Sequence, residues 1–255
     1  MTQDICTDPF NLSMFQAISD WQRGGDAKQN KRRGQVLKEA CAAISGSYRT
    51  SVLACFRQVG LVKGSVWDLL TENCLAEKVS SWTFDIEVAK EFKSGVPPEG
   101  QGYQGVIFCI KPPPTSCVIV NLRELYKNPG FCAGMERNKS AINGYADGAG
   151  RYWDRQSEVV LEIDAVTQEE IYSLGGHSSP FEQLVAQAAE ITYGRAATPD
   201  EVEALLLKAE HVRPQIGPKW LTPEATKRVL ARTKPKAVAL AEIKRNCEPG
   251  RRNVS

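Results

Sequence analysis

Long apolar runs and targeting signals are missing from this sequence of 255 residues. No stretch approaches the ~18 uninterrupted apolar positions that a membrane-spanning helix requires. Residues 1–15 also lack the basic cluster and following apolar run that mark a signal peptide. We therefore expect no membrane association, and a location in the cytoplasm of the producing cell, or of a target cell if the protein is delivered to one.

Residues that ligate metals are few and scattered. The chain has two histidines and eight cysteines, and no two cysteines have the C-x-x-C spacing. A structural zinc site needs four nitrogen or sulfur ligands, usually supplied in close pairs, so the sequence predicts no metal. Several cysteines lie in the apolar runs LACF, VIFCI and SCVIV, where a free thiol behaves as a small hydrophobic side chain. We expect these thiols to be buried and reduced.

The net charge of +2 conceals an asymmetry between the two ends of the chain. Residues 208–255 carry twelve Lys and Arg against four Glu, whereas residues 1–207 carry 20 basic and 26 acidic side chains. A basic segment on a mildly acidic body favours an anionic partner such as nucleic acid, because clustered cations release counterions from a polyphosphate. A solvated tail, or a contact with an acidic protein, explains the same charge.

Hydrophobic periodicity divides the chain into three predicted segments. Residues 1–47 show apolar positions at helical spacing, as in Phe10, Met14 and Ile18, and predict two helices. Residues 48–176 predict a β-rich core with a glycine-rich surface loop at 127–151. Residues 177–255 predict a basic helical extension. The fold class we expect is α+β, with a short-stranded core flanked by N-terminal and C-terminal helices. The strands are expected within 48–59, 105–110, 116–122, 155–163 and 169–176, and an extended piece at 80–84 precedes a helix capped by Asp85.

Three short features follow one another in the β-rich segment. A predicted strand carries a lone arginine, Arg57, in FRQV. The sequence SSWT then ends an extended piece and is followed by a helix with A-x-x-F spacing. Finally Q-S-E, residues 156–158, opens the run VVLEI. Because residues i and i+2 of a strand point to the same face, we expect Gln156 and Glu158 to project side by side.

This order of features resembles the R-S-E class of mono-ADP-ribosyltransferases, which includes the cholera-toxin-like and C3-exoenzyme-like enzymes. The resemblance covers about residues 48–175 and implies a split β-sandwich core. It implies NAD⁺ as co-substrate, transfer of ADP-ribose to a macromolecule with release of nicotinamide, and no metal. A small enzyme of this class looks like a bacterial or phage-related toxin, a delivered effector or an anti-phage factor, and the resemblance leaves these three open. An antitoxin or immunity protein that neutralises it is a candidate partner.

The resemblance assigns a role to each feature. Glu158 would stabilise the positive charge that develops on the ribose as nicotinamide leaves. Ser81 would donate a hydrogen bond to Glu158 and hold it in place, and Arg57 would grip phosphate or ribose. Many relatives have glycine where this chain has Gln58. The catalytic set is Glu158, Gln156 and Ser81, and the NAD⁺-binding set is Arg57, Gln58, Ser81, Thr83 and Phe92.

The acceptor is predicted from Gln156 and the segment before it. An amide cannot act as a general base, but it pairs with another amide or with the edge of a nucleobase. Tyr152, Trp153 and Arg155 would meet the acceptor, and an aromatic ring there can stack on an exposed base, which favours a nucleobase in DNA or RNA. An asparagine-like protein side chain is the alternative acceptor, and Trp153 can instead anchor the loop to the core. A further alternative is a non-catalytic module that binds nucleic acid or a protein partner.

Overall fold

The computed structural model describes residues 10–98, 102–112, 117–177, 180–215 and 217–247. It is a mixed α+β protein, 54% helix and 19% strand, with a large antiparallel sheet. The chain forms two compact units that divide it differently from the three predicted segments. Unit 1 comprises Met1–Gln58, Glu72–Phe92 and Phe108–Glu170, and unit 2 comprises Val59–Thr71, Lys93–Ile107 and Ile171–Ser255.

Unit 1 is built on antiparallel strands in the order β5-β6-β3-β1. The central pair joins β3 and β6 in a register that sets Thr83 opposite Glu158 and Ser81 opposite Val160. A separate two-stranded ladder pairs β2 with β7. The strands are β1 (Cys55–Val62), β2 (Leu75–Ala76), β3 (Val79–Thr83), β4 (Tyr103–Ile110), β5 (Val118–Asn121), β6 (Glu158–Glu162) and β7 (Ala165–Val166), of which β1 and β4 contribute residues to each unit.

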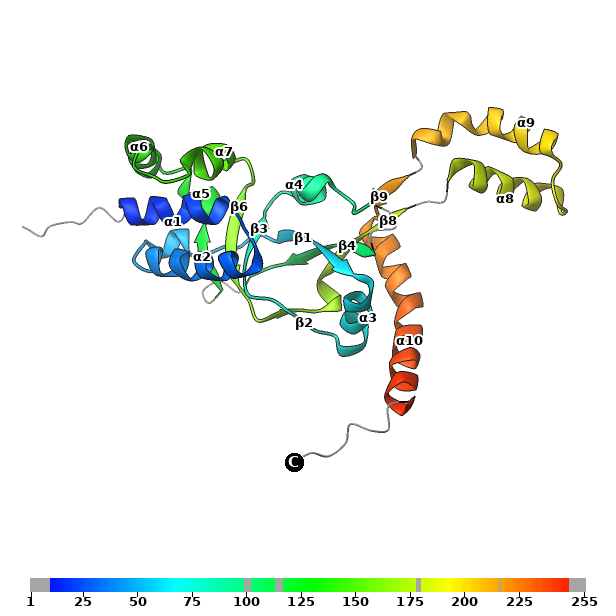
Figure 1. Cartoon of the computed structure of the whole chain (residues 1–255), viewed down its shortest axis with the longest axis horizontal. Coiled ribbons are helices and arrows are strands. Elements are labelled where there is room, and N and C mark those ends of the chain that lie inside the picture. The colour runs from blue at the N-terminus through cyan, green and yellow to red at the C-terminus, as the bar shows by residue number, and fades with distance from the viewer. Residues whose placement is uncertain (1–9, 99–101, 113–116, 178–179, 216, 248–255) are drawn as a thin grey trace, which may run out of the picture. The chain divides into compact units, whose positions relative to one another are not determined.

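Helices cover the β5-β6-β3 region of unit 1 (Figure 1). Their apolar faces and the strands share one core, in which Phe15, Ile18 and Phe131 are almost completely buried. The two N-terminal helices begin where the sequence supplies caps: the Asn11 side chain accepts from the Met14 backbone, and Asp26 forms a capping box with Gln29. The helices of this core are α1 (Leu12–Gln22), α2 (Ala27–Ala40), α5 (Leu122–Leu125), α6 (Pro129–Asn138) and α7 (Ala149–Tyr152). Unit 1 also contains α4 (Ile86–Glu91), which contacts β3.

Unit 2 contains an antiparallel pair, β8 with β9, and the long helix α10, which packs against β8. The backbone amide of Leu174 in β8 donates to the buried Oγ1 of Thr226 in α10 at 3.1 Å. A second feature is the helical hairpin of α8 and α9, whose second helix opens with a Thr198 cap followed by Pro199. The elements are α3 (Lys63–Glu72), β8 (Ile171–His177), α8 (Phe181–Tyr193), α9 (Pro199–Ala209), β9 (Pro218–Trp220) and α10 (Pro223–Cys247).

The predicted surface loop at 127–151 is wrong, because this segment contains α6 and α7. Helix α6 starts at an Asn128 cap followed by Pro129, and Phe131 and Met135 are buried in the core. Its glycine serves packing: a Cβ added to Gly134 would lie 2.7 Å from the Phe15 ring. Gly134 therefore allows a close contact between α6 and Phe15 of α1 in the core, and the segment is helical.

Smaller corrections concern strand limits and thiols. The strand predicted from residue 48 begins only at Cys55, and strand β9 was not predicted because it is three residues long. The N-terminal and C-terminal segments are parts of units 1 and 2, and α1 and α2 share the sheet's core. Of the thiols expected to be buried, Cys55 and Cys117 are buried and Cys109 is partly exposed, while Cys74, outside those runs, is exposed. Among the described residues the free thiols are Cys41, Cys55, Cys74, Cys109, Cys117 and Cys132.

Candidate functional site

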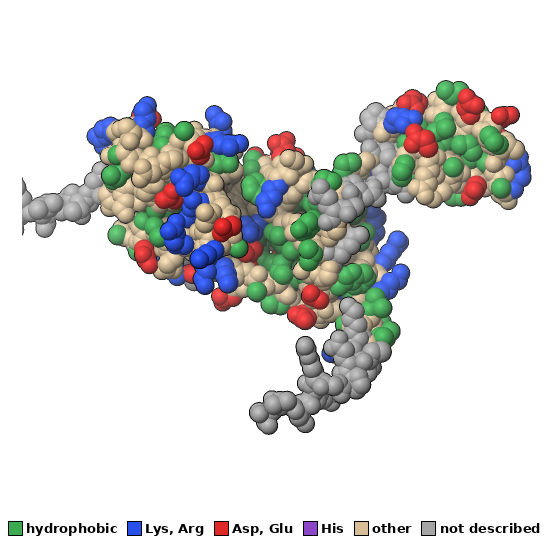
Figure 2. Space-filling view, in the orientation of Figure 1, with side chains coloured by type: hydrophobic (Ala, Val, Ile, Leu, Met, Phe, Trp, Pro, Cys, Tyr) green, Lys and Arg blue, Asp and Glu red, His purple; other side chains and the backbone are tan. Residues whose placement is uncertain are grey.

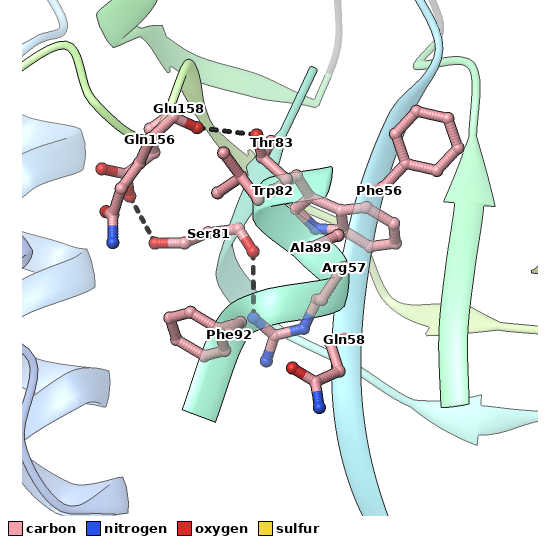
Figure 3. Close-up of a pocket in the computed structure, with 11 residues that line it drawn as sticks. Phe56, Arg57, Gln58, Ser81, Trp82, Thr83, Ala89, Phe92, Gln156 and Glu158 are labelled. Atoms are coloured by element: carbon pink, nitrogen blue, oxygen red, sulfur yellow. Dashed lines mark hydrogen bonds between the residues drawn. The ribbon is translucent and has the colours of Figure 1, made fainter. Parts of the chain in front are cut away.

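A pocket in unit 1 lies among β1, β3, α4 and the start of β6 (Figure 3). It encloses about 410 Å³ of empty space, part of which is open to solvent. Every residue of the predicted catalytic and NAD⁺-binding sets lines this pocket. The lining residues are Phe56, Arg57, Gln58, Ser81, Trp82, Thr83, Val88, Ala89, Phe92, Gln156 and Glu158.

Glu158 is the buried carboxylate of this pocket, with only 4% of its surface exposed. The Ser81 hydroxyl donates to Oε1, which is the hydrogen bond predicted between these two residues (Figure 3). The Trp21 indole donates to the same oxygen at 2.9 Å, and the Gln22 amide donates to Oε2 at 3.4 Å. The register of β3 and β6 makes Ser81 a diagonal neighbour of Glu158 on the same face of the sheet.

Burial and hydrogen bonding act in opposite directions on the Glu158 pKa. Desolvation raises the pKa above its ordinary value, because the charged form loses its contact with water. The hydrogen bonds from Ser81, Trp21 and Gln22 lower the pKa, since each donor stabilises the carboxylate, but desolvation is the largest cause and the pKa is raised. A carboxylate in such a site is poorly screened, so it interacts strongly with a positive charge placed beside it.

Arg57 lines the pocket and also has fixed partners within unit 1. Its Nε donates to the Glu77 carboxylate at 3.0 Å, and its Nη1 donates to the Ser81 carbonyl at 3.1 Å (Figure 3). The side chain is 27% exposed, so part of the guanidinium surface remains accessible. Arg57 thus has the ordinary role of an arginine in a strand, an ion pair, and it ties β1 to the backbone of Ser81.

The predicted strand geometry of Q-S-E is wrong. Strand β6 begins at Glu158, and Ser157 has a positive φ of 43°, so Gln156 lies in the turn before the strand. The Gln156 carbonyl accepts a hydrogen bond from Thr83 Oγ1 at 2.6 Å. Gln156 and Glu158 nevertheless line the same pocket (Figure 3), because the turn and the strand, and not strand alternation, bring them there.

The predicted acceptor residues other than Gln156 do not line the pocket. Trp153 packs on Tyr126, with ring centroids 4.8 Å apart, and its carbonyl accepts from Gln22 at 3.2 Å. The structure thus favours the anchoring role that the sequence left open for Trp153. The Arg151 guanidinium lies 5.4 Å from the Tyr152 ring centroid, and Arg155 is exposed.

Trp21 and Gln22 were missed by the sequence analysis, although both touch Glu158. They lie at the end of α1, 137 and 136 positions away from the carboxylate, so no local spacing connects them to it. Tyr126 supports the arrangement by donating its hydroxyl to Gln22 Oε1 at 2.9 Å. One sequence pattern does point to Trp21, because it continues the apolar stripe of Met14 and Ile18 and is therefore predicted to be buried. A buried indole N–H needs a hydrogen-bond acceptor, so the pattern predicts a polar partner for Trp21 in the core.

Comparisons with protein-family models, with curated proteins and with solved structures found no match. The described residues include no helix long and apolar enough to cross a membrane. They also include no group of three or more His, Cys, Asp or Glu side chains placed to hold a metal ion.

Proposed function

We propose that the protein is an NAD⁺-dependent mono-ADP-ribosyltransferase whose reaction takes place in the pocket around Glu158. The proposal includes the split β-sandwich core of that class, formed around the strands of unit 1. The observation that carries it is the convergence of three residues in one pocket. These are Glu158, the Ser81 hydroxyl bonded to it, and Arg57 bonded to the Ser81 backbone.

The proposed reaction uses the charge of Glu158. The bond between the nicotinamide nitrogen and ribose C1′ breaks, and nicotinamide leaves with the bonding electrons. The sugar acquires positive charge, which the poorly screened carboxylate stabilises. An acceptor nucleophile then bonds to C1′ and loses a proton, so that the products are nicotinamide and the ADP-ribosylated acceptor.

Other lining residues suit the binding of NAD⁺ as substrate. The accessible part of the Arg57 guanidinium is suited to a phosphate or ribose oxygen. Phe92 offers an exposed aromatic face at the rim, and Gln58 offers an amide.

For the acceptor we propose a nucleobase of DNA or RNA, with a protein asparagine as the alternative. The Gln156 amide lines the pocket that Glu158 also lines, and an amide there can pair with either acceptor. Tyr152 is the remaining aromatic residue for stacking, since Trp153 packs on Tyr126. Incubation with labelled NAD⁺ and a cell lysate, followed by nuclease or protease, separates the two: label that resists nuclease and is lost with protease contradicts the nucleobase.

Glu158→Gln tests the enzymatic proposal, with Glu162→Gln as the matched control on the same strand. We expect Glu158→Gln to slow nicotinamide release from NAD⁺ by at least about a hundredfold, because an amide cannot offset the charge on the sugar. Glu162 is partly exposed and pairs with Lys38 at 2.6 Å outside the pocket, so its variant should keep wild-type activity. Circular dichroism checks that both variants fold.

The same measurement decides between an enzyme and a binding module. Nicotinamide release is compared between lysate with NAD⁺ alone and the same mixture with the wild-type protein added. If the protein does not increase the rate, the proposed activity is wrong and the non-catalytic alternative stands. Equal activity in the wild type and Glu158→Gln would likewise remove Glu158 from the reaction.

A further inference from the structure

A second hollow in unit 1 lies between α1 and α2 and shares no lining residue with the Glu158 pocket. Its walls are Ala17 and Asp20 from α1, and Arg32, Arg33 and Val36 from α2. It encloses about 510 Å³ of empty space, including the part open to solvent. Two neighbouring arginines in one small hollow concentrate positive charge at a single place.

Arg33 is the unusual residue of this hollow. Only 9% of its surface is exposed, and no hydrogen bond or ion pair joins its guanidinium to any described residue. Arginines with so little exposed surface are normally paired with carboxylates, whereas the guanidinium nitrogens of Arg33 keep some contact with solvent at the hollow that the residue lines. An unpaired guanidinium in a hollow is therefore suited to an anionic group supplied from outside.

The turn between the two helices is shaped around this guanidinium. Gly25 has a φ of 151°, and a Cβ added there would lie 3.0 Å from Arg33 Nη1. Glycine at this position lets the backbone approach the arginine closely. The Gln29 side chain lies nearer still, with its Oε1 closest to that Cβ, so the Gln29 and Arg33 side chains both lie close to the turn.

The one acidic residue of the hollow has its own partner. Asp20 faces Arg23 of the same helix at 3.7 Å, so its charge is shared with a third arginine. Further basic side chains lie nearby on α2, including the exposed Lys28 and Lys31. Figure 2 shows Lys and Arg side chains gathered over α1 and α2.

We propose that Arg32 and Arg33 form a binding site for a phosphate group in the hollow between α1 and α2. Guanidinium and phosphate form parallel, charge-assisted hydrogen bonds, and this geometry favours phosphate over a monovalent anion such as chloride. The phosphate belongs either to a nucleic-acid backbone or to a small phosphorylated compound. This site does not depend on the proposed transferase activity.

Arg33→Met tests the site, and Lys31→Gln is the control, since it removes one charge from the same helix outside the hollow. Methionine has a similar length and no charge, so without ligand this variant should unfold at the wild-type temperature or above. Pyrophosphate should raise the Tm of the wild type and of Lys31→Gln above the value in sodium chloride of equal ionic strength. For Arg33→Met the rise should disappear.

Two binding measurements distinguish the two sources of the phosphate group. Titration calorimetry measures the binding of pyrophosphate, and fluorescence anisotropy measures the binding of a labelled single-stranded oligonucleotide. We expect Arg33→Met to weaken whichever ligand binds by about tenfold or more, as the loss of a charge-assisted pair predicts. Arg33-dependent binding of the oligonucleotide alone indicates a nucleic-acid backbone, and binding of pyrophosphate indicates a small phosphate compound. Glu158→Gln should bind like the wild type, whatever its effect on NAD⁺ cleavage.

Two results would overturn the phosphate site. One is the absence of binding or Tm change with both ligands in the wild type. The other is an effect of equal size in the wild type and in Arg33→Met, which would mean that the anions act through general surface charge.

Discussion

At the scale of single residues, Glu158 combines deep burial with three hydrogen-bond donors. Burial alone would favour the neutral carboxylic acid, which could not stabilise a positive sugar. The donors Ser81, Trp21 and Gln22 favour the charged form and so offset part of that cost. In its ionised form the Glu158 carboxylate is poorly screened and held in position by these donors, an arrangement that suits electrostatic catalysis.

The acidic limb of the activity profile should report the Glu158 pKa. Activity needs the carboxylate, and burial raises its pKa above the ordinary value of 4.5, so nicotinamide release should fall with a midpoint above pH 4.5 as pH decreases. Ser81→Ala removes a donor that lowers this pKa, so the midpoint should move to higher pH. Ser80→Ala is the control, because Ser80 bonds Trp82 and the Lys78 carbonyl, and not Glu158.

An acidic limb that stays in place in Ser81→Ala would contradict this role of the hydroxyl. The same raised pKa affects stability with a defined sign. Folding favours the protonated carboxyl, so its contribution to stability is full below pH 4.5 and is lost as pH rises through the raised pKa.

Residue patterns could predict part of this site and not the rest. Arg57, Ser81 and Glu158 were connected through the order of short motifs, and they line one pocket. The strand alternation expected for Gln156 failed, because a positive φ at Ser157 is a local backbone choice that the residue type does not reveal. The packing of Trp153 on Tyr126 depends on α6 and its neighbours, which the sequence analysis had assigned to a loop.

At the scale of elements, α1 is part of the site as well as part of the core. Its apolar face packs through Met14 and Ile18, and its last turn presents Trp21 and Gln22 to the carboxylate. The apolar spacing predicts the helix, but no local pattern places the end of α1 against a strand more than a hundred positions away. Helix α1 thus connects core packing to the chemistry of the pocket.

Trp21→Phe tests this connection. Phenylalanine keeps an aromatic ring in the core but cannot donate to Glu158, so we expect a loss of stability of about 1–3 kcal/mol. The acidic limb should again move to higher pH, a shift that lost packing alone would not cause. Trp67→Phe, at a partly exposed position in unit 2, should change neither the stability nor the position of the acidic limb. Denaturant unfolding and the pH profile of nicotinamide release provide the two measurements.

At the scale of the whole molecule, the two units do not follow the boundaries that composition suggested. The basic C-terminal segment predicted as an extension contributes β9 and α10 to unit 2, where Trp220 pairs with Gly175. Hydrophobic periodicity predicts the helices of this segment, but its basic charge describes only their solvent-exposed faces and does not predict which faces are buried. What fixes α10 to unit 2 is a small set of buried contacts around Thr226 and Ala237.

Thr226→Val should destabilise unit 2. Thr226 is completely buried, and its hydroxyl oxygen accepts from the Leu174 amide, which would lose its partner in the isosteric valine variant. We expect a loss of about 1–3 kcal/mol, the cost of a buried donor without an acceptor. Thr233→Val on the same helix removes only a bond to the Val229 carbonyl, so its unfolding curve should stay close to wild type. Similar curves for both variants would contradict the role given to Thr226.

The hydrogen bond between Trp21 and Glu158 has a consequence for synthesis. A chain growing from the ribosome exposes α1 early, but the strand that carries Glu158 emerges only after more than a hundred further residues have been added. Until then the Trp21 indole cannot bond to Glu158, and a fragment that ends before β6 lacks the carboxylate of the pocket. Any activity of this pocket would therefore begin only after β6 has been synthesised and Glu158 has bonded to Trp21 of the N-terminal helix α1.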